Sequence, residues 1–561
     1  MIAKKLPIVV GLNRSQDASI TIFHGNEHHG SIQKERLTHI KHDWGKVNDL
    51  SLYKKVFPIL HHPVDLIVEC FSSDVEIKNE KLYIEEIENT FKLADGYQRI
   101  HMSHHLAHLY STLSASRYDR GAGLVIDFQG SYTKDITEAY PPTSPADGLE
   151  VASFYSFLGS NITCIHKHIW NGDRNHPEGL GMFYNFLSKC FYTGDGKEGK
   201  VMGLASHGKM MDLPDLDVEG GNVYIGREWI DIFKQTALYD FSANKKTFQE
   251  KADLAATGQM KFQQALLKIT QWLQQTTQEK NLCYSGGCAL NVIGNSFIRQ
   301  NSGFNSVFIP PAPGDGGTSI GCALYGLQHI IKKPSNFVWA NDYLGPAQPI
   351  GHIEDTVSRY PSLTIERPSN LEERCAHLLH EGQVAALFQE RSEFGPRALG
   401  NRSIIADPRY GVTKFWINQF IKGREWYRPI APVVLEEDAA TYFDLHDPSP
   451  FMLYTAQIKR KYERELEAIR HNDNSARVQT VNEQMNPFLY RVIKNFKVLS
   501  SIGIVLNTSF NLKGDTIVET VEEAIDSFSK KPFHCLIVPP YLITKKNPPE
   551  NILQISDIYY D

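Results

Sequence analysis

The sequence predicts an α/β fold divided into two domains, residues 1–345 and 346–561. Three observations lead to this prediction. The chain has 561 residues, more than one hydrophobic core usually serves, so two or more domains are expected. Patterns typical of buried strands alternate with helical patterns, as they do in α/β proteins. A stretch rich in Pro, Asn and Gly between about residues 333 and 370 interrupts the alternation and provides a domain boundary.

The first domain opens with a strand at residues 6–12, which we prefer to a signal peptide because the segment lacks a long apolar region and a small-residue cleavage site. A polar loop from Asn13 to Asp17 leads to a second strand at 18–23, and a third begins near Gly30. The later elements, judged by apolar runs and helical periodicity, are a strand at 64–71, a helix at about 103–117, a strand at 122–128, a long helix at 252–279, a strand at 282–285, a helix near 289–300, a strand at 307–310 and a helix near 317–331.

The second domain begins with an amphipathic helix at residues 370–381, followed by a buried strand at 383–388 and a long loop. Residues 456–475 are rich in charge, which predicts an exposed excursion from the core. The apolar run at 501–506 predicts another buried strand.

The composition is that of a globular protein, with 42% hydrophobic and 22% charged residues. No run of about 18 apolar residues exists, so no membrane span is expected. The net charge of −6 argues against broad binding to nucleic acid. The 8 cysteines are scattered and form no C-x-x-C pair, which predicts free thiols in a reducing compartment, and we expect a cytoplasmic protein.

A histidine-rich segment, HMSHHLAH, is the sharpest local signal. His104 and His108 are four residues apart, so on a helix they share one face and can bind one metal ion, while His105 points elsewhere. Such pairs also arise by accident on surface helices. Asp127 ends an apolar strand, where α/β sheets bind ligands, and Asp315 is either a fourth ligand or a helix N-cap. Two His and two Asp suit Fe(II), Mn(II) or Zn(II).

Three glycine-rich segments are candidate ligand-binding loops. SGGCALN, which contains Gly286, Gly287 and Asn291, and PAPGDGG each lie between a predicted strand and a predicted helix. In such loops, backbone N–H groups can bind phosphate. GKVMGLASHG, which contains Lys200 and Gly203, is the third. None matches the Walker pattern or G-x-G-x-x-G, so a tight connection without a ligand is the alternative.

Positive charge is concentrated between Arg391 and Arg428 in the second domain. This segment has eight basic and three acidic residues and therefore a net charge of +5. Arginine and lysine side chains suit phosphate and carboxylate anions. A solvated basic surface is the alternative, although the interspersed Gly, Pro and aromatic residues are unusual for a helix face. The basic residues are Arg391, Arg397, Arg402, Arg409, Lys414, Lys422, Arg424 and Arg428.

Short polar side chains follow the predicted strand at 501–506, in the sequence LNTSFN. Ser509 and Asn511 belong to this cluster. The G-x-S-x-G form of a nucleophile elbow is absent, so no serine nucleophile is predicted. The cluster either binds a ligand or stabilises a turn.

Taken together, these motifs resemble the NodU/CmcH-type carbamoyltransferase family over nearly the whole chain. The resemblance rests on the opening loop that ends in DAS and on HHLAH, GKVMGLASHG, SGGCALN, PAPGDGG, FGPRALGNRSI, KGREWYRPIAP, SARVQTV and LNTSFN. It implies an N-terminal domain of the sugar-kinase/heat-shock ATPase/actin (ASKHA) type. It also implies a C-terminal YrdC-like domain that forms a mixed anhydride with AMP.

The resemblance implies a two-step reaction. Carbamoyl phosphate and ATP, with Mg, give carbamoyl adenylate in the second domain, and the first domain passes the carbamoyl group to a hydroxyl of a small-molecule natural product. The implied metal ligands, for Fe(II) or another divalent ion, are His104, His108, Asp127 and Asp315. The implied transfer-site residues are Gln16, Asp17, His104 and Asp127. The residues implied for nucleotide, phosphate and carbamoyl phosphate are Lys200, Gly203, Gly286, Gly287, Asn291, Arg397, Lys422, Arg428, Arg477, Ser509 and Asn511.

Two positions depart from the family pattern. Relatives usually have His-Asp-Ala-Ser in the opening loop, with the histidine as a proposed base, whereas this chain has Gln16 before Asp17. Because glutamine takes up no proton near neutral pH, Asp17, metal assistance or a more nucleophilic amine acceptor would have to replace that base. Relatives also have D-G-x-G after the strand, whereas here Phe128 and Gln129 follow Asp127.

Three functions remain open at this stage. The first is ATP-dependent O-carbamoyl transfer, and the second is transfer to an amine or another unusual acceptor. The third is a non-catalytic nucleotide-binding protein of the ASKHA type. Release of pyrophosphate that depends on carbamoyl phosphate would distinguish the first two from the third, and product analysis would distinguish the first from the second.

Overall fold

The computed structural model describes residues 6–72, 80–142, 145, 147–194, 196–236 and 246–555. The chain forms two compact units, residues 1–38 with 42–339 and residues 39–41 with 340–561. The predicted two-domain α/β class is therefore confirmed. The predicted domain limit at residue 345 remains a prediction, and the units divide after Trp339. Within the described ranges, no helix is long and apolar enough to cross a membrane.

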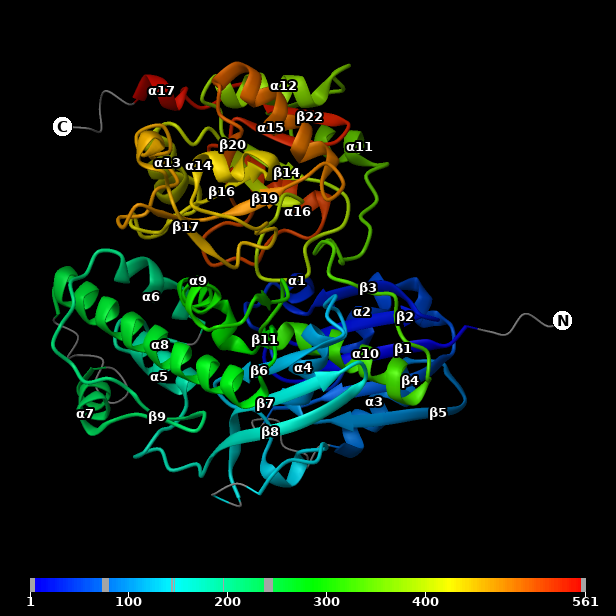
Figure 1. Ribbon diagram of the computed structural model, residues 1–561. Coiled ribbons are helices and arrows are strands. Elements are labelled where there is room, and N and C mark those ends of the chain that lie inside the picture. Colours follow the sequence, from blue (N-terminus) through cyan, green and yellow to red (C-terminus); the bar gives the residue numbers. More distant parts are fainter. Residues whose placement is uncertain are drawn as a thin grey trace. The chain divides into compact units, whose positions relative to one another are not determined.

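Two five-stranded sheets form the framework of the first unit (Figure 1). Both sheets are mixed. In the first, strand β1 (Ile8–Asn13) pairs antiparallel with one neighbour and parallel with the other, and in the second, strand β6 (Arg120–Ile126) does the same. The first has the order β3 (Glu27–Gln33), β2 (Ser19–His24), β1 (Ile8–Asn13), β4 (Val64–Cys70), β5 (Leu93–Met102). The second has the order β12 (Ser306–Phe308), β11 (Asn281–Ser285), β6 (Arg120–Ile126), β7 (Leu149–Leu158), β8 (Asn161–Trp170). A separate hairpin joins β9 (Asp217–Glu219) and β10 (Asn222–Tyr224).

Two buried helices pack against these sheets and against each other. α10 (Thr318–Tyr325) contacts β1, β2 and β4 of the first sheet, and α4 (His104–Leu113) contacts β6 and β11 of the second. All ten residues of α4 are buried, as expected of a helix enclosed on every side. The helices approach closely because Gly321 has no side chain: a Cβ there would lie 1.8 Å from the carbonyl oxygen of Ala107. This packing holds the first turns of both helices in fixed positions.

The remaining helices of the first unit surround this framework. The predicted long helix is confirmed as α8 (Phe248–Thr277), which begins with a capping box between Thr247 and Glu250. The prediction of a loop at 199–208 is wrong, because most of this segment belongs to helix α6 (Glu198–Ala205). The others are α1 (Glu35–Thr38), α2 (Leu50–Val56), α3 (Glu80–Thr90), α5 (Leu180–Lys189), α7 (Arg227–Thr236) and α9 (Val292–Asn301), with short η1 (Pro58–His61), η3 (Thr133–Asp135), η5 (Gly287–Leu290), η6 (Asp315–Gly317) and η7 (Gly326–Ile330).

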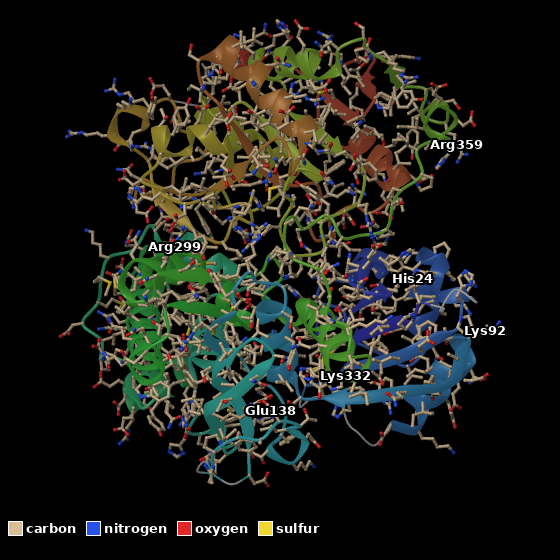
Figure 2. The ribbon with its side chains drawn as sticks, turned by 45° about the vertical axis from the view of Figure 1, so that its right-hand side comes forward. His24, Lys92, Glu138, Arg299, Lys332 and Arg359 are labelled. Atoms are coloured by element: carbon tan, nitrogen blue, oxygen red, sulfur yellow. The ribbon has the colours of Figure 1, made fainter. Side chains whose placement is uncertain are left out.

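A largely buried ion-pair network anchors the start of α4. The Lys167 ammonium group lies 2.7 Å from Glu150 and 2.8 Å from Glu138, which is labelled in Figure 2. Glu150 also accepts a hydrogen bond from the backbone N–H of His105, at 3.0 Å. A helix leaves its first N–H groups without partners inside the helix, so this carboxylate stabilises the first turn of α4.

An eight-stranded mixed sheet forms the second unit. Helices cover both of its faces. The sheet has the order β13 (Leu363–Glu366), β22 (Tyr541–Lys545), β21 (Cys535–Val538), β14 (Ala385–Phe388), β15 (Arg402–Ala406), β20 (Ile504–Ser509), β16 (Ala431–Leu435), β19 (Gln479–Val481). A short hairpin pairs β17 (Thr455–Gln457) with β18 (Ser475–Arg477). The helices are α11 (Ile353–Ser358), α12 (Leu371–His380), α13 (Gly411–Trp416), α14 (Ala439–Tyr442), α15 (Pro487–Ser500), α16 (Val521–Lys530) and α17 (Ile552–Ile555), with η8 (Ile417–Ile421), η9 (Glu436–Asp438) and η10 (Arg460–Tyr462).

Both faces of this sheet are covered, so the strands β14, β16 and β21 are buried and apolar throughout. In β14, Ala386 and Phe388 join the core beneath α11 and α16, whereas Ala385 and Leu387 join the core beneath α12 and α15. Successive residues of a strand point to opposite faces, which explains this division. The predicted strands at 383–388 and 501–506 correspond to β14 and β20, whose apolar residues are buried as expected.

The prediction that residues 456–475 form an exposed excursion is partly wrong. Leu466, Ala468 and Ile469 are completely buried, and Leu466 and Ile469 belong to the core of the second unit. The charged residues that dominate this segment lie beside them on the outside. Ala456 and Ile458 of the same segment are also buried in this core, so composition described the outer face of the segment and missed the apolar residues that anchor it.

Candidate functional site

The histidine-rich helix is buried, not exposed. His104, His105 and His108 each have 0% of their surface accessible, which excludes the alternative of a surface helix. α4 begins at His104, whose backbone N–H donates a hydrogen bond to Ser131 Oγ at 2.9 Å. The ring of His105 points away to Ser153 Oγ, 2.8 Å from Nδ1, as its place on the helix predicts.

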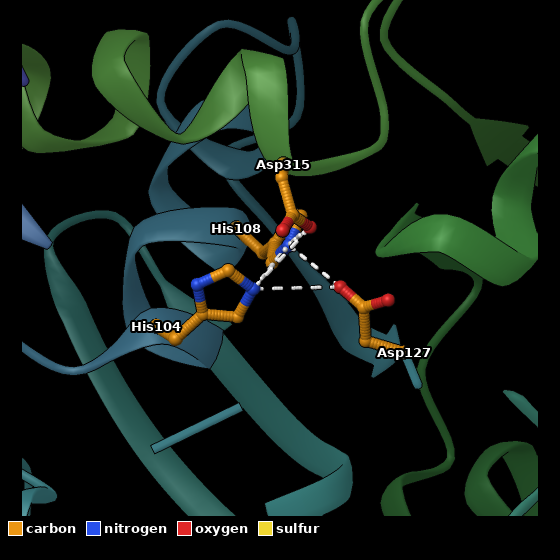
Figure 3. A group of neighbouring side chains, drawn as sticks. All are labelled: His104, His108, Asp127 and Asp315. Carbon is orange, nitrogen blue, oxygen red and sulfur yellow. Dashed lines mark hydrogen bonds and ion pairs between the residues drawn. The ribbon is translucent and has the colours of Figure 1, made fainter. Parts of the chain in front are cut away.

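Four side chains from three parts of the chain point into one space (Figure 3). His104 and His108 come from α4, Asp127 directly follows β6, and Asp315 starts the segment that leads into α10. The two Nε2 atoms are 3.1 Å apart. Asp127 Oδ2 lies 3.0 Å from Nε2 of His108 and 3.5 Å from that of His104, and Asp315 Oδ1 lies 3.4 Å from both. The four potential ligand atoms all lie within 4.8 Å of one another.

The electrostatics of this cluster favour positive charge between the side chains. Burial lowers the pKa of His104 and His108, but the carboxylates of Asp315 and Asp127 outweigh it and raise both pKa values. Burial raises the pKa of Asp127, but hydrogen bonds from the two histidines bring it well below its usual range. Two ring nitrogens so close together can share one proton or one cation. The four ligand atoms therefore fit a divalent metal ion, with two nitrogen and two oxygen donors.

The glycines after β11 pack against the strand end that carries Asp127. Gly286 has a φ of +94°, and a Cβ there would lie 2.3 Å from the carbonyl oxygen of Ile126. A Cβ on Gly287 would lie 2.8 Å from Asp127 Oδ1. The Asn291 side chain caps α9 by accepting a hydrogen bond from Gly294 N–H, and it also forms hydrogen bonds with the Gln259 side chain. Its polar atoms therefore serve to hold the loop and the helices together. The SGGCALN loop therefore passes close to the end of β6 and to the Asp127 carboxylate.

Replacing Gly286 by alanine should lower the free energy of unfolding by about 1–3 kcal/mol, because alanine is strained at positive φ and its Cβ meets the backbone. The measurement is chemical denaturation. Gly226→Ala is the control: nothing lies within 4 Å of a Cβ there, so a change within about 0.5 kcal/mol is expected. Equal stability of the two variants would contradict the close packing after β11.

The opening loop of the first unit carries Gln16 and Asp17. Among the described residues, the Gln16 side chain has no hydrogen-bond partner. The backbone carbonyl oxygen of Gln16 accepts a hydrogen bond from Asn13 Nδ2 at 2.8 Å. Asp17 Oδ1 lies 2.9 Å from Nδ1 of His42, a residue that the sequence analysis missed. No local pattern links the two, since 25 residues separate them.

Two other predicted residues of the first unit lie on α6. Lys200 extends over the ring of Tyr192, with Nζ 5.0 Å from the ring centroid. Gly203 is buried within the helix. Because this segment is helical, the backbone N–H groups beyond its first turn bond within the helix and do not form a phosphate-binding loop.

Six of the eight predicted basic residues, together with Arg477, separate into two groups. Arg402 and Arg409 are held by protein partners: Arg402 donates hydrogen bonds to the Gln389 and Glu519 carbonyl oxygens, and Arg409 forms an ion pair with Asp407 at 2.6 Å. The other group consists of side chains that repel one another electrostatically. We call it the basic cluster, and its members are Arg397, Lys422, Arg424, Arg428 and Arg477.

Burial and mutual repulsion destabilise the charges of the basic cluster. Burial, together with the charge of Arg428, lowers the pKa of Arg397 to about 10 and that of Arg424 to about 9. Burial and the neighbouring arginines lower the pKa of Arg477 well below its usual range. The Nε atoms of Arg397 and Arg477 are buried without a hydrogen-bond partner in the described part of the chain. Buried like charges with unused donors require an anion to compensate them.

Lys422 is linked to the polar segment after β20. Its Nζ donates to the Ser509 carbonyl oxygen at 2.6 Å, to Ser509 Oγ at 3.1 Å and to Asn511 Oδ1 at 2.7 Å. Burial and the charges of Arg424 and Arg428 lower the pKa of Lys422 well below its usual range. The structure thus brings the predicted Ser509 and Asn511 to the basic cluster through Lys422.

Models of known protein families match both units of the chain. The family model "Carbamoyltransferase N-terminus" matches residues 80–324, and "Carbamoyltransferase C-terminus" matches residues 376–545. Nodulation protein NolO of Bradyrhizobium diazoefficiens is 31% identical over 469 residues, which cover 79% of each chain. The 3'-hydroxymethylcephem-O-carbamoyltransferase of Amycolatopsis lactamdurans is 34% identical over 368 residues, which cover 62% of this chain and 66% of the relative.

Among solved structures, full-length HypF in its phosphate- and nucleotide-bound form has a TM-score of 0.35 and 14% identity, over 59% of this chain and 57% of HypF. HypF from T. kodakarensis has a TM-score of 0.34, also with 14% identity, over 59% of this chain and 48% of that protein. Nothing about function follows from likenesses at this level.

Proposed function

Because this chain belongs to the carbamoyltransferase family, we propose that it uses ATP and carbamoyl phosphate to carbamoylate a hydroxyl group of a small-molecule natural product. The reaction has two half-reactions. Carbamoyl phosphate, ATP and water give carbamoyl adenylate, pyrophosphate and phosphate. The acceptor hydroxyl then displaces AMP from the carbamoyl carbon. We assign the first half-reaction to the second unit and the second to the first unit.

The basic cluster is the single observation that carries this proposal. Adenylate formation brings two polyanions together, and their repulsion must be offset by fixed positive charge. Arg397, Arg428 and Arg477 provide guanidinium forks, and Lys422 provides a point charge next to Ser509 and Asn511. The Nε donors of Arg397 and Arg477, which are buried and have no partner among the described residues, support an anionic ligand in this place.

For the transfer half-reaction, His104, His108, Asp127 and Asp315 would hold a divalent metal, Fe(II) being our first choice. Such an ion, when bound, polarises a carbonyl group or stabilises the charge that develops on it. The protein residues hold the ligand atoms in place: Ser131 and Glu150 fix the start of α4, and Gly287 leaves room for the Asp127 carboxylate. Mg would accompany ATP in the other half-reaction. The eight free, buried cysteines support a reducing compartment, and we propose the cytoplasm.

The test has two measurements on the intact protein. Pyrophosphate release from ATP is measured with and without carbamoyl phosphate, and mass spectrometry identifies products formed from a panel of polyol, macrolactone and amine acceptors. Release that requires carbamoyl phosphate, with a carbamate ester as product, is expected. A product on amines alone would replace hydroxyl transfer by N-carbamoylation. No stimulation by carbamoyl phosphate would refute the adenylate step.

A further inference from the structure

Asp17 and His42 form an ion pair outside the cluster of four metal-ligand candidates. Nδ1 of His42 lies 2.9 Å from Asp17 Oδ1, and the two side chains are 41% and 26% exposed. An aspartate bound to one ring nitrogen of a histidine fixes the orientation and tautomer of the ring and leaves the other nitrogen for proton transfer. The pair is accessible enough to meet a substrate and has the arrangement of a base with its orienting carboxylate.

Both residues are held in an uncommon backbone conformation. Asp17 has a φ of +52° and His42 a φ of +54°, a region that Asp and His enter more readily than most residues. The backbone N–H of His42 donates to Glu35 Oε2 at 3.1 Å. The next residue, Asp43, is buried and bound by Lys34 and Thr38. Strain that the surroundings maintain at two contacting polar residues is typical of functional sites.

Asn13 connects this pair to the cluster of metal-ligand candidates. Its Nδ2 donates to the carbonyl oxygens of Asp17 at 3.1 Å and of Asp315 at 3.0 Å. One amide group therefore fixes the loop that carries Asp17 against the segment that carries Asp315. The Asp315 carboxylate is also close enough to raise the pKa of Asp17, in addition to the larger effect of burial. The pair thus lies beside the centre to which we assign carbamoyl transfer.

Within the described part of the chain, the second ring nitrogen of His42, Nε2, has no hydrogen-bond partner. It faces Gly196, where a Cβ would lie 2.4 Å from Nε2. A side chain at that position would collide with the His42 ring, and glycine avoids this collision.

We propose that His42, oriented by Asp17, is the base that accepts the proton of the acceptor hydroxyl. This inference rests on the proposed function. The acceptor O–H bond breaks and its proton moves to Nε2, while the acceptor oxygen forms a bond to the carbamoyl carbon. The bond between that carbon and the phosphate oxygen of AMP breaks, and AMP leaves with the electron pair. His42 then returns the proton to solvent. Gln16, which cannot take up a proton, needs no chemical role.

The charges around His42 determine the pH dependence. The hydrogen bond that His42 donates to the Asp17 carboxylate, opposed in part by burial and assisted by Glu35 and Glu198, raises the pKa of His42 to about 9. His42 is therefore mostly protonated at pH 7, and its basic form increases as the pH rises. The rate of transfer should rise about tenfold per pH unit below pH 9 and then level off.

The test measures single-turnover transfer from preformed carbamoyl adenylate between pH 6 and 10. His42→Asn keeps a residue that tolerates positive φ but removes the base. We expect its rate near pH 9 to fall by about 10²–10⁴-fold and to lose the rising limb, while pyrophosphate release in the first half-reaction is unchanged. The matched control is His24→Asn, an exposed histidine at the end of β2 that is labelled in Figure 2, and it should behave as wild type. Histidine NMR should show that Asp17→Asn returns the pKa of His42 toward 6.5.

Each outcome is decisive. If wild type transfers the carbamoyl group and His42→Asn keeps the same rising limb, His42 is not the base, and the proposed function stands. If Asp17→Asn leaves the titration of His42 unchanged, Asp17 does not orient it and this inference is also refuted. If wild type carbamoylates no hydroxyl acceptor at any pH, both this inference and the proposed function fail.

Discussion

Replacing His104 and His108 together by alanine should abolish the metal binding that we propose for them and slow the proposed carbamoyl transfer by more than roughly 100-fold. The estimate follows from the loss of two of four ligands, since even a group that only supports a ligand commonly contributes 10- to 100-fold. Metal content is measured after anaerobic purification, and transfer is measured from preformed carbamoyl adenylate. Pyrophosphate release in the first half-reaction should stay within about twofold of wild type, because the basic cluster is untouched.

The matched control for this variant is the double replacement of His61 and His62, two exposed histidines at the end of η1. It should change neither metal content nor transfer. Asp315→Asn is a second variant, nearly isosteric and with a side chain that is 17% exposed, in case the buried double variant folds poorly. An unchanged metal content in both variants would show that these side chains hold no metal.

Arg428→Ala and Lys422→Ala should each slow adenylate formation by roughly 30- to 5,000-fold, which corresponds to about 2–5 kcal/mol for a desolvated contact to an anion. Lys422 is buried, and its ammonium group also positions Ser509 and Asn511, so its replacement should have the larger effect. The measurement is pyrophosphate release that depends on carbamoyl phosphate. Transfer from preformed carbamoyl adenylate should be affected much less.

Arg359→Ala is the control for these variants, because Arg359 is exposed at the end of α11 and is labelled in Figure 2. Arg428→Lys keeps the charge but removes the fork, so an intermediate rate is expected. If Arg428→Ala and Lys422→Ala both release pyrophosphate at the wild-type rate, the basic cluster does not bind the reacting anions.

Much of the fold could be predicted because local patterns and burial agree. In β14, AALF is apolar throughout since both faces of the sheet are covered, and a run of this kind bounded by turn residues indicates a buried strand. α8 carries a clear helical period and a capping box. The failures have equally local causes: the glycines in α6 suggested a loop, although tertiary packing holds the segment in a helix. The charged residues of 456–475 concealed five buried apolar residues.

The sequence by itself determined the chemical types of the candidate groups: a histidine pair with helical spacing, carboxylates at the ends of elements, and an excess of arginine and lysine in the second unit. Helical spacing is a local property, so the shared direction of His104 and His108 followed from it. Only the tertiary structure decided which groups meet. The packing of α10 against α4 brings Asp315 to the two histidines, and the backbone conformation at Asp17 and His42 brings together residues that no periodicity connects. Contacts between distant segments depend on how whole elements pack, and the repeat of one helix or strand carries no information about that packing.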